Sequence, residues 1–292
     1  MAEWFVFLPQ IRMSLADIVI RARAAEDAGF DGIAFIDHLL APGAEHQPLW
    51  EAMTAATWVA ARTDRLRVGH LVLCDAFRHP ALLAKQAATL QEASGGRFEL
   101  GLGSGSIPAE LTRFGITEDR ASQRHRRLAR TLDLLAAHWD PDSDLALPPT
   151  PAVPIPLLVG GVGPRTLELV RRHASWWNLP APHLPRLPEL LGEIGSARVS
   201  VQQAIGFAGA ASDPERVAEL ARRRFGYLGD GLVCGDAARL RARFAALTRL
   251  GVERFYVWFT DFADPATLAE FGESVIAHDA ATPSAGERDC RP

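Results

Sequence analysis

The chain has 292 residues, 48% of them apolar and 23% charged, with a formal net charge of −4 at pH 7. This balance predicts a globular protein with a sizeable core, and it offers no basic surface of the kind that binds nucleic acid. The three cysteines stand far apart, which argues against a disulfide framework or a structural zinc site, and no signal peptide or long apolar run is recognisable, which predicts a cytoplasmic protein without a membrane span.

Short apolar runs alternate with segments of helical period along the first half of the chain. The runs predict strands over residues 4–9, 31–37, 65–74 and 97–103. The periodic segments predict helices over residues 14–29, 48–63, 79–94 and 120–139. Ser14 and Asp17 have the spacing of a capping box, which marks the start of the first helix.

The alternation continues after a proline-rich loop over residues 140–154. Strands are predicted over residues 155–161, 175–178, 198–207 and 253–260. Helices are predicted over residues 164–174, 184–194, 213–226, 236–251 and 265–279. Eight strand–helix alternations indicate parallel crossovers and favour an α/β fold, the closed (β/α)8 TIM barrel. We expect residues 1–279 to form one domain and residues 280–292 to be a disordered tail.

In such a barrel the active site lies at the carboxyl ends of the strands. Cys74 ends the third predicted strand, and the glycine-rich residues 103–106 end the fourth. The turn VGGVG, residues 159–163, precedes a helix whose free N–H groups and dipole can hold a phosphate, with Arg165 adding charge. The alternative is a tight turn that binds nothing. A Rossmann site is excluded because the first strand and its loop, FLPQIRMSLAD, contain no glycine.

Asp37 and His38 end the second predicted strand. A histidine at the barrel mouth can donate a proton or a hydrogen bond to a cofactor ring. The competing interpretation makes Asp37 a helix cap and His38 a satisfied structural residue. No third ligand accompanies His38 and His46, so we predict no metal site. The serines of GSGS have no histidine and acid in sequence that complete a triad.

Four segments together resemble the luciferase-like superfamily of flavin and deazaflavin oxidoreductases. They are FIDHLL at 35–40, RVGHLVLCDAFRHPALLAKQAATLQEASGGRFELGLGSGS at 67–106, ELTRFG at 110–115 and PIPLLVGGVGPRTLELVRRHASWWN at 154–178. The resemblance extends from the first predicted strand to the eighth. It implies a luciferase-like (β/α)8 barrel, usually homodimeric, that binds FMN or coenzyme F420 at its mouth.

The resemblance also implies roles for individual residues. Asp37 and His38 match an acid–histidine pair beside the cofactor ring, and we predict them as catalytic. A non-prolyl cis peptide is expected behind the ring, between Leu71 and Val72. The predicted cofactor-binding residues are Leu71, Val72, Cys74, Ser104, Gly105, Ser106, Gly160, Gly161, Val162, Gly163 and Arg165. Ser106 stands where many relatives have a tryptophan or an acid, which leaves proton donation to His38 or to the substrate.

The leading interpretation is F420-dependent hydride transfer to or from a small organic substrate, favoured by the Asp-His form of the pair and by the arginine-rich composition. A second interpretation keeps the family but uses reduced FMN to activate O₂, with a separate flavin reductase as partner. A third is a flavin-binding barrel without catalysis. For the homodimer that the resemblance implies, the candidate contact residues are Trp58, Leu82, Leu83 and Leu90. Helix faces packed on the barrel would give the same apolar pattern.

Overall fold

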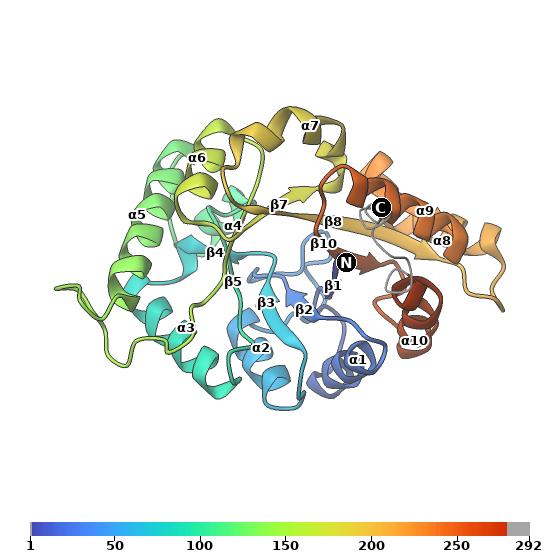
Figure 1. The fold of residues 1–292 in the computed structure, drawn as a ribbon, viewed down its shortest axis with the longest axis horizontal. Coiled ribbons are helices and arrows are strands. Elements are labelled where there is room, and N and C mark those ends of the chain that lie inside the picture. Colours follow the sequence, from blue (N-terminus) through green and yellow to red (C-terminus); the bar gives the residue numbers. More distant parts are fainter. Residues whose placement is uncertain (1, 279–292) are drawn as a thin grey trace, which may run out of the picture.

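The chain forms parallel strands surrounded by helices, as the alternation predicts (Figure 1). A computed structural model describes residues 2–278, so the predicted tail over residues 280–292 lies outside the described part. All neighbouring strands pair in parallel. The strands are β1 (Glu3–Phe7), β2 (Gly32–Phe35), β3 (Arg67–His70), β4 (Leu73–Cys74), β5 (Leu100–Gly103), β6 (Leu157–Gly160), β7 (Trp176–Pro180), β8 (Arg198–Phe207), β9 (Leu232–Gly235) and β10 (Arg254–Phe259).

The sheet curls into a nearly closed barrel. Its strand order is β3-β2-β1-β10-β8-β7-β6-β5-β4, with β9 paired to β8 beside this path. The two end strands, β3 and β4, belong to one predicted strand, which is interrupted by a cis peptide between Leu71 and Val72, as expected. A parallel bridge between Val68 and Phe98 joins β3 to the segment before β5. The predicted (β/α)8 barrel is thereby confirmed, with its third strand split in two.

The helices cover the outside of the barrel (Figure 1). They are α1 (Leu15–Asp27), α2 (Ala52–Ala60), α3 (Pro80–Ala93), α4 (Pro108–Arg113), α5 (Ala121–Trp139), α6 (Pro164–His173), α7 (Leu187–Leu190), α8 (Pro214–Phe225), α9 (Ala237–Arg249) and α10 (Pro265–Phe271). The capping box at the start of α1 is confirmed, because Ser14 and Asp17 each accept the backbone N–H of the other. Among residues 2–278, no helix is long and apolar enough to cross a membrane.

Three elements differ from the prediction. The helix predicted over residues 184–194 is a chain of short pieces, since α7 lies between 3₁₀ turns at Ala181–Arg186 and Leu191–Glu193. Prolines at every third position from 182 to 188 remove the N–H donors that a regular helix needs. Strand β9 and helix α4, of four and six residues, were not predicted; β9 is only half-buried, so it lacks the continuous apolar run of the other strands.

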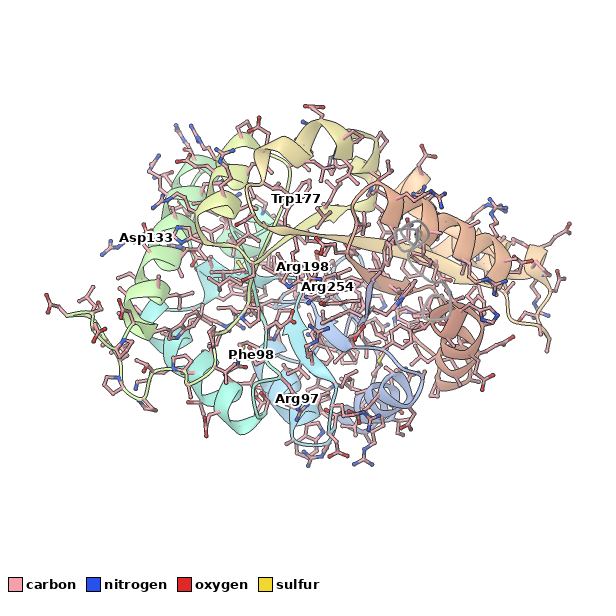
Figure 2. All side chains as sticks on the ribbon, in the orientation of Figure 1. Arg97, Phe98, Asp133, Trp177, Arg198 and Arg254 are labelled. Atoms are coloured by element: carbon pink, nitrogen blue, oxygen red, sulfur yellow. The ribbon has the colours of Figure 1, made fainter. Side chains whose placement is uncertain are left out.

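The apolar core has two layers, which follow from the alternation of side chains along each strand. Phe5 and Phe7 of β1 point into the barrel, where they pack with Ile36 and Tyr256. Trp4 and Val6 belong to the larger layer between the barrel and its helices. Side chains crowd both spaces, and the labelled Trp177 and Phe98 are fully buried (Figure 2). A rigid packed barrel is the scaffold on which the strand ends can hold a site.

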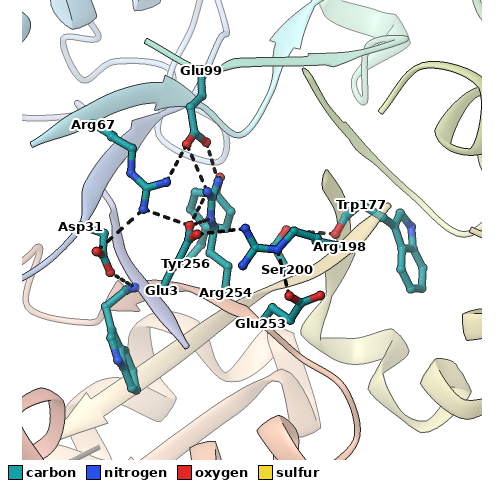
Figure 3. A network of polar contacts seen from close by, with 11 residues as sticks. Glu3, Asp31, Arg67, Glu99, Trp177, Arg198, Ser200, Glu253, Arg254 and Tyr256 are labelled. Carbon is teal, nitrogen blue, oxygen red and sulfur yellow. Dashed lines mark hydrogen bonds and ion pairs between the residues drawn. The ribbon is translucent and has the colours of Figure 1, made fainter. Parts of the chain in front are cut away.

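Charged side chains fill the amino-terminal end of the barrel (Figure 3). Arg254 is completely buried and binds Glu3 and Glu99, with 2.5 Å between its Nη1 and Glu99 Oε2. Arg67 bridges the same two carboxylates at 2.9 and 3.1 Å. Burial alone would raise the pKa of Glu3, but the adjacent Arg254 and Arg67 outweigh burial and hold that pKa below its ordinary value. This network closes the barrel end opposite to the predicted site.

His70, the last residue of β3, makes stability depend on pH. Burial lowers the pKa of His70 to about 4, and its ring Nε2 lies 3.2 Å from the carbonyl oxygen of Ala52. The unfolded chain therefore binds the extra proton first, at an ordinary pKa of about 6.5. The neutral His70 therefore adds about 3 kcal/mol to the free energy of unfolding above about pH 6.5. This contribution is lost as the pH falls toward 4.

Urea unfolding at pH 7 and pH 4.5 measures this effect. Carboxylates such as Glu3 also lose charge in acid, so the comparison is made with His70→Gln, in which only the imidazole is absent. We expect the stability of the variant to fall less between the two pH values, by about 2–3 kcal/mol. The same acid loss in both proteins would contradict the assignment to His70.

Candidate active site

A cavity of about 310 Å³ opens among the carboxyl ends of the barrel strands. Most of the predicted site residues line it, although they come from loops far apart in the sequence. These are Asp37, His38, Leu71, Val72, Cys74, Ser104, Gly105, Ser106, Gly160 and Gly161. Val162, Gly163 and Arg165 do not line this cavity. The barrel thus assembles one pocket from four of the predicted segments.

The glycine turn after β6 is held by its neighbour β7. Gly161 has a φ of 123°, a conformation that favours glycine, and it donates its N–H to the carbonyl oxygen of Asn178 at 3.2 Å. Its own carbonyl accepts the indole N–H of Trp177 at 2.8 Å. The Gly161 N–H is therefore already used. A phosphate at this turn would bind the free N–H groups at the start of α6, where Gly163 is the N-cap and Arg165 is exposed.

His38 is oriented by a carboxylate to which the sequence analysis gave no role. Its Nδ1 lies 2.8 Å from Oε2 of Glu110, and Glu110 Oε1 accepts the backbone N–H groups of Leu39 and Leu40 at 2.7 and 3.0 Å. Against a carboxylate, Nδ1 carries the proton of a neutral ring, which leaves Nε2 as the acceptor. Nε2 has no hydrogen-bond partner among the described residues.

Glu110 occupies the first turn of α4, the short helix that follows β5. The sequence offers two signals for it, since Glu110 begins ELTRFG, one of the segments that carry the family resemblance, and Pro108 suits the start of a helix. Glu110 lies four residues after Ser106, in the segment that follows β5, and is in contact with His38. Ser106 itself is exposed and lines the cavity.

Asp37 is fully occupied by bonds within the protein. Its Oδ2 accepts the Cys74 N–H at 2.7 Å and Nη1 of Arg78 at 2.5 Å, and Oδ1 accepts Nη2 of Arg78 at 3.0 Å. Arg78 also pairs with Glu51 at 2.7 Å. Burial would lower the pKa of Arg78, but the two carboxylates raise it above its ordinary value, so the ion pair stays charged. This pair joins the end of β2 to the segment after β4.

Cys74 faces the cavity as a thiol. Burial raises its pKa to about 11, so it is not ionised near neutral pH and is a poor nucleophile. Its sulfur packs under the loop after β5, where a Cβ on Gly105 would lie 3.1 Å from Sγ. A Cβ on Gly103 would lie 2.6 Å from a methyl group of Val72. These glycines allow the backbone to form a close-fitting wall.

A second cavity of about 760 Å³ adjoins the first. The two share Ile36, His38, Leu71 and Gln202 in their linings, so His38 stands at their junction. Among the described residues, no group of three histidines, cysteines or carboxylates is placed to hold a metal ion. The arrangement is suited to a bound organic cofactor in one cavity and a substrate in the other, with an imidazole between them.

The sequence of residues 4–191 matches the family model of the luciferase-like monooxygenases. The chain belongs to this family. The luciferase-like chain is 29% identical over 239 residues to the F420-dependent hydroxymycolic acid dehydrogenase of Mycobacterium tuberculosis. These aligned residues cover 76% of the chain and 62% of that protein. The chain is 32% identical over 162 residues to the F420-dependent glucose-6-phosphate dehydrogenase of Amycolatopsis mediterranei, covering 51% and 48%. The chain thus spans about half the length, or somewhat more, of these curated relatives.

Solved structures of luciferase-like barrels have the same fold. An F420-dependent secondary alcohol dehydrogenase in complex with an F420-acetone adduct has a TM-score of 0.79 and 17% identity, covering 94% of this chain and 98% of that one. The EDTA monooxygenase of Chelativorans has a TM-score of 0.76 and 14% identity, covering 96% and 94%. At this identity the likeness concerns the fold, which hosts both kinds of enzyme.

Proposed function

We propose that the chain is an F420-dependent oxidoreductase that transfers hydride to or from a small organic substrate. The observation that carries this proposal is the position of His38, which Glu110 orients at the junction of two cavities. The names of the sequence relatives support F420 as the cofactor. The parallel barrel supports a site at this end of the strands.

The smaller cavity fits the ring end of such a cofactor. Its lining includes Leu71, Val72 and the glycines at 103, 105, 160 and 161, which carry no side chain. Leu71 and Val72 would lie behind the ring, and the turn at Gly160 with the start of α6 would hold the phosphate. When bound, F420 supplies the hydride chemistry, while the protein supplies binding, orientation and electrostatics.

In this proposal hydride is transferred to or from the carbon of a carbonyl or alcohol group. His38 gives a proton to the oxygen of that group, or takes one from it. The Glu110 carboxylate fixes the Nδ1 proton, so that Nε2 exchanges a proton with the substrate oxygen. Glu110 is a positioning residue, because its own oxygens are bound to His38 and to two backbone N–H groups. We assign Asp37 a positioning role as well, since its ion pair with Arg78 fixes the backbone next to His38.

A second candidate is an FMN-dependent monooxygenase, favoured by the description of the matching family model. In that case a separate flavin reductase would supply reduced FMN. The two candidates use the same cavity and differ in the cofactor that it selects. The third interpretation, a flavin-binding barrel without catalysis, predicts binding but no turnover.

Titration of the full chain with F420 and with FMN, followed by absorbance and fluorescence, distinguishes these candidates. We expect F420 to bind at least about tenfold more tightly than FMN, a difference of about 1.4 kcal/mol. Gly161→Val should weaken F420 binding by a similar factor, because a side chain is strained at a φ of 123° and meets Thr166 at 3.3 Å. Gly192→Val, whose Cβ meets nothing within 4 Å, is the control. Tighter FMN binding with O₂-dependent turnover would favour the monooxygenase.

We also propose that the chain is a homodimer through the outer face of α2 and α3. Trp58 and Leu82 are 39% and 56% exposed, which supports a contact there. Leu83 and Leu90 belong to the core at 1% and 3% exposure, so the expectation that they form part of this surface was wrong. Their helical spacing reflected packing on the barrel instead. Light scattering of the wild type beside Leu82→Glu tests the dimer.

A further inference from the structure

The larger cavity has an aromatic wall. Phe225 and Trp258 meet edge to face with ring centroids 4.9 Å apart, and Phe7 packs on the other side of Trp258 at 5.3 Å. Ile11 and Phe262 extend the apolar lining. An apolar wall of this extent, in a cavity of about 760 Å³, favours a ligand with an apolar or aromatic body.

Two solvent-exposed arginines line this cavity without a carboxylate beside them. Arg12 and Arg224 belong to its lining, and no aspartate or glutamate does. Neither arginine has a carboxylate partner among residues 2–278. Arg224 uses one nitrogen, which donates to the carbonyl oxygen of Thr260 at 3.2 Å. The remaining guanidinium donors are free to bind an anionic group, which arginine binds through two parallel hydrogen bonds.

The backbone holds two lining residues of this cavity in an unusual conformation. Arg12 and Phe262 have φ values of 62° and 64°, in the left-handed region that residues other than glycine rarely adopt. The Arg12 N–H is held by the carbonyl oxygen of Pro48 at 3.0 Å, and the Phe262 N–H by that of Phe259 at 3.0 Å. Such a conformation costs about 1–3 kcal/mol and is typical of ligand-binding sites. Arg12 thus lines the cavity together with the aromatic residues.

We propose that this cavity binds a substrate with an apolar, aromatic body and an anionic group, such as an aryl carboxylate, whose charge Arg12 and Arg224 neutralise. The inference rests on the proposed function in one respect, since it takes this cavity as the substrate side of His38. The anion would bind at the arginines, and the apolar body would extend along Phe225 and Trp258 toward the imidazole.

Binding of small probes to the full chain tests the inference, by calorimetry with and without F420. The probes are 4-phenylbutyrate, its uncharged amide 4-phenylbutanamide, and butyrate, which lacks the ring. We expect the phenylbutyrate ion to bind at least about tenfold more tightly than either of the others, because charge-assisted hydrogen bonds and ring burial each contribute. The double variant Arg12→Gln/Arg224→Gln should bind the acid and the amide equally.

Arg223→Gln is the matched control, since Arg223 is an exposed neighbour on α8 that does not line the cavity, and it should keep the preference for the acid. Equal binding of acid and amide to the wild type, or a preference that survives the double variant, would overturn the inference. Butyrate that binds as tightly as phenylbutyrate would also overturn the inference, because butyrate lacks the ring. A double variant that loses F420 affinity would overturn it too, by assigning the arginines to the cofactor. Because the cofactor-free chain is also titrated, failure of F420 to bind contradicts the proposed function alone.

Discussion

His38→Ala is expected to lower F420-dependent turnover about 10²–10⁴-fold, the range that a positioned general acid or base contributes. F420 affinity should change little, because the cofactor would be held by the backbone of other loops. His46→Ala is the matched control, since His46 is exposed and lines neither cavity. Steady-state rates at saturating F420, with separate binding titrations, give both quantities. Turnover that survives His38→Ala would contradict the assignment.

Glu110→Gln separates catalysis from positioning. The amide oxygen can still accept the N–H groups of Leu39 and Leu40, but the amide nitrogen would face His38 Nδ1 and donate to it. That arrangement favours the tautomer with the proton on Nε2. We expect a smaller loss of turnover than in His38→Ala, together with a changed pH–rate profile. A profile identical to that of the wild type would show that Glu110 does not set the state of the imidazole.

Arg254→Met is expected to destabilise the fold by about 3–5 kcal/mol, the cost of breaking a buried ion pair by removing one partner. Arg254 is fully buried, and without it the carboxylates of Glu3 and Glu99 would keep only peripheral arginines (Figure 3). Its guanidinium also lies 3.7 Å from the centroid of Trp176, so packing is lost as well. Urea unfolding measures the difference.

The control for this substitution is Arg165→Met, an exposed arginine whose replacement should change stability by no more than about 0.5 kcal/mol. Arg254→Met/Glu99→Gln also removes one of the two carboxylates that Arg254 neutralises, so it should recover part of the loss. This double variant keeps the test informative if the single variant is too unstable to purify. The pKa of Glu3 should rise toward its ordinary value in Arg254→Met. Since a lowered carboxylate pKa stabilises the fold above the unfolded pKa, the variant should lose less stability in acid. Destabilisation below about 1 kcal/mol would contradict the importance of this network.

Much of the barrel is predictable because most strands are buried on both faces and the long helices on one. Strand β1 is apolar from Trp4 to Phe7, and α1 begins at a capping box, so local chemistry and tertiary position agree there. Local pattern did not indicate the six-residue helix α4 or the strand β9, whose four residues are only half-buried. It also failed at residues 184–194, where apolar spacing indicated a helix and the prolines prevented a regular one.

The site was predictable in its parts because parallel strands end at one edge of a barrel. The residues at those ends, including His38, Ser104 and Gly160, line one cavity. Their partners were not predictable, because each partner is remote in the sequence. Glu110 is 72 positions from His38, and Arg78 is 41 positions from Asp37. No local rule relates residues at such separations.

The sequence by itself determined the alternation of strands and helices, and with it the end of the barrel at which polar residues gather. Its motifs also indicated the luciferase-like family, which the match over residues 4–191 confirms. Only the tertiary structure decided which of those residues are free to act. Asp37 is bound on both oxygens by Arg78 and the backbone, while His38 keeps one ring nitrogen for the cavity. The physical reason is that hydrogen bonding and ion pairing depend on distance in space, which the strand order of the closed barrel sets and sequence separation does not.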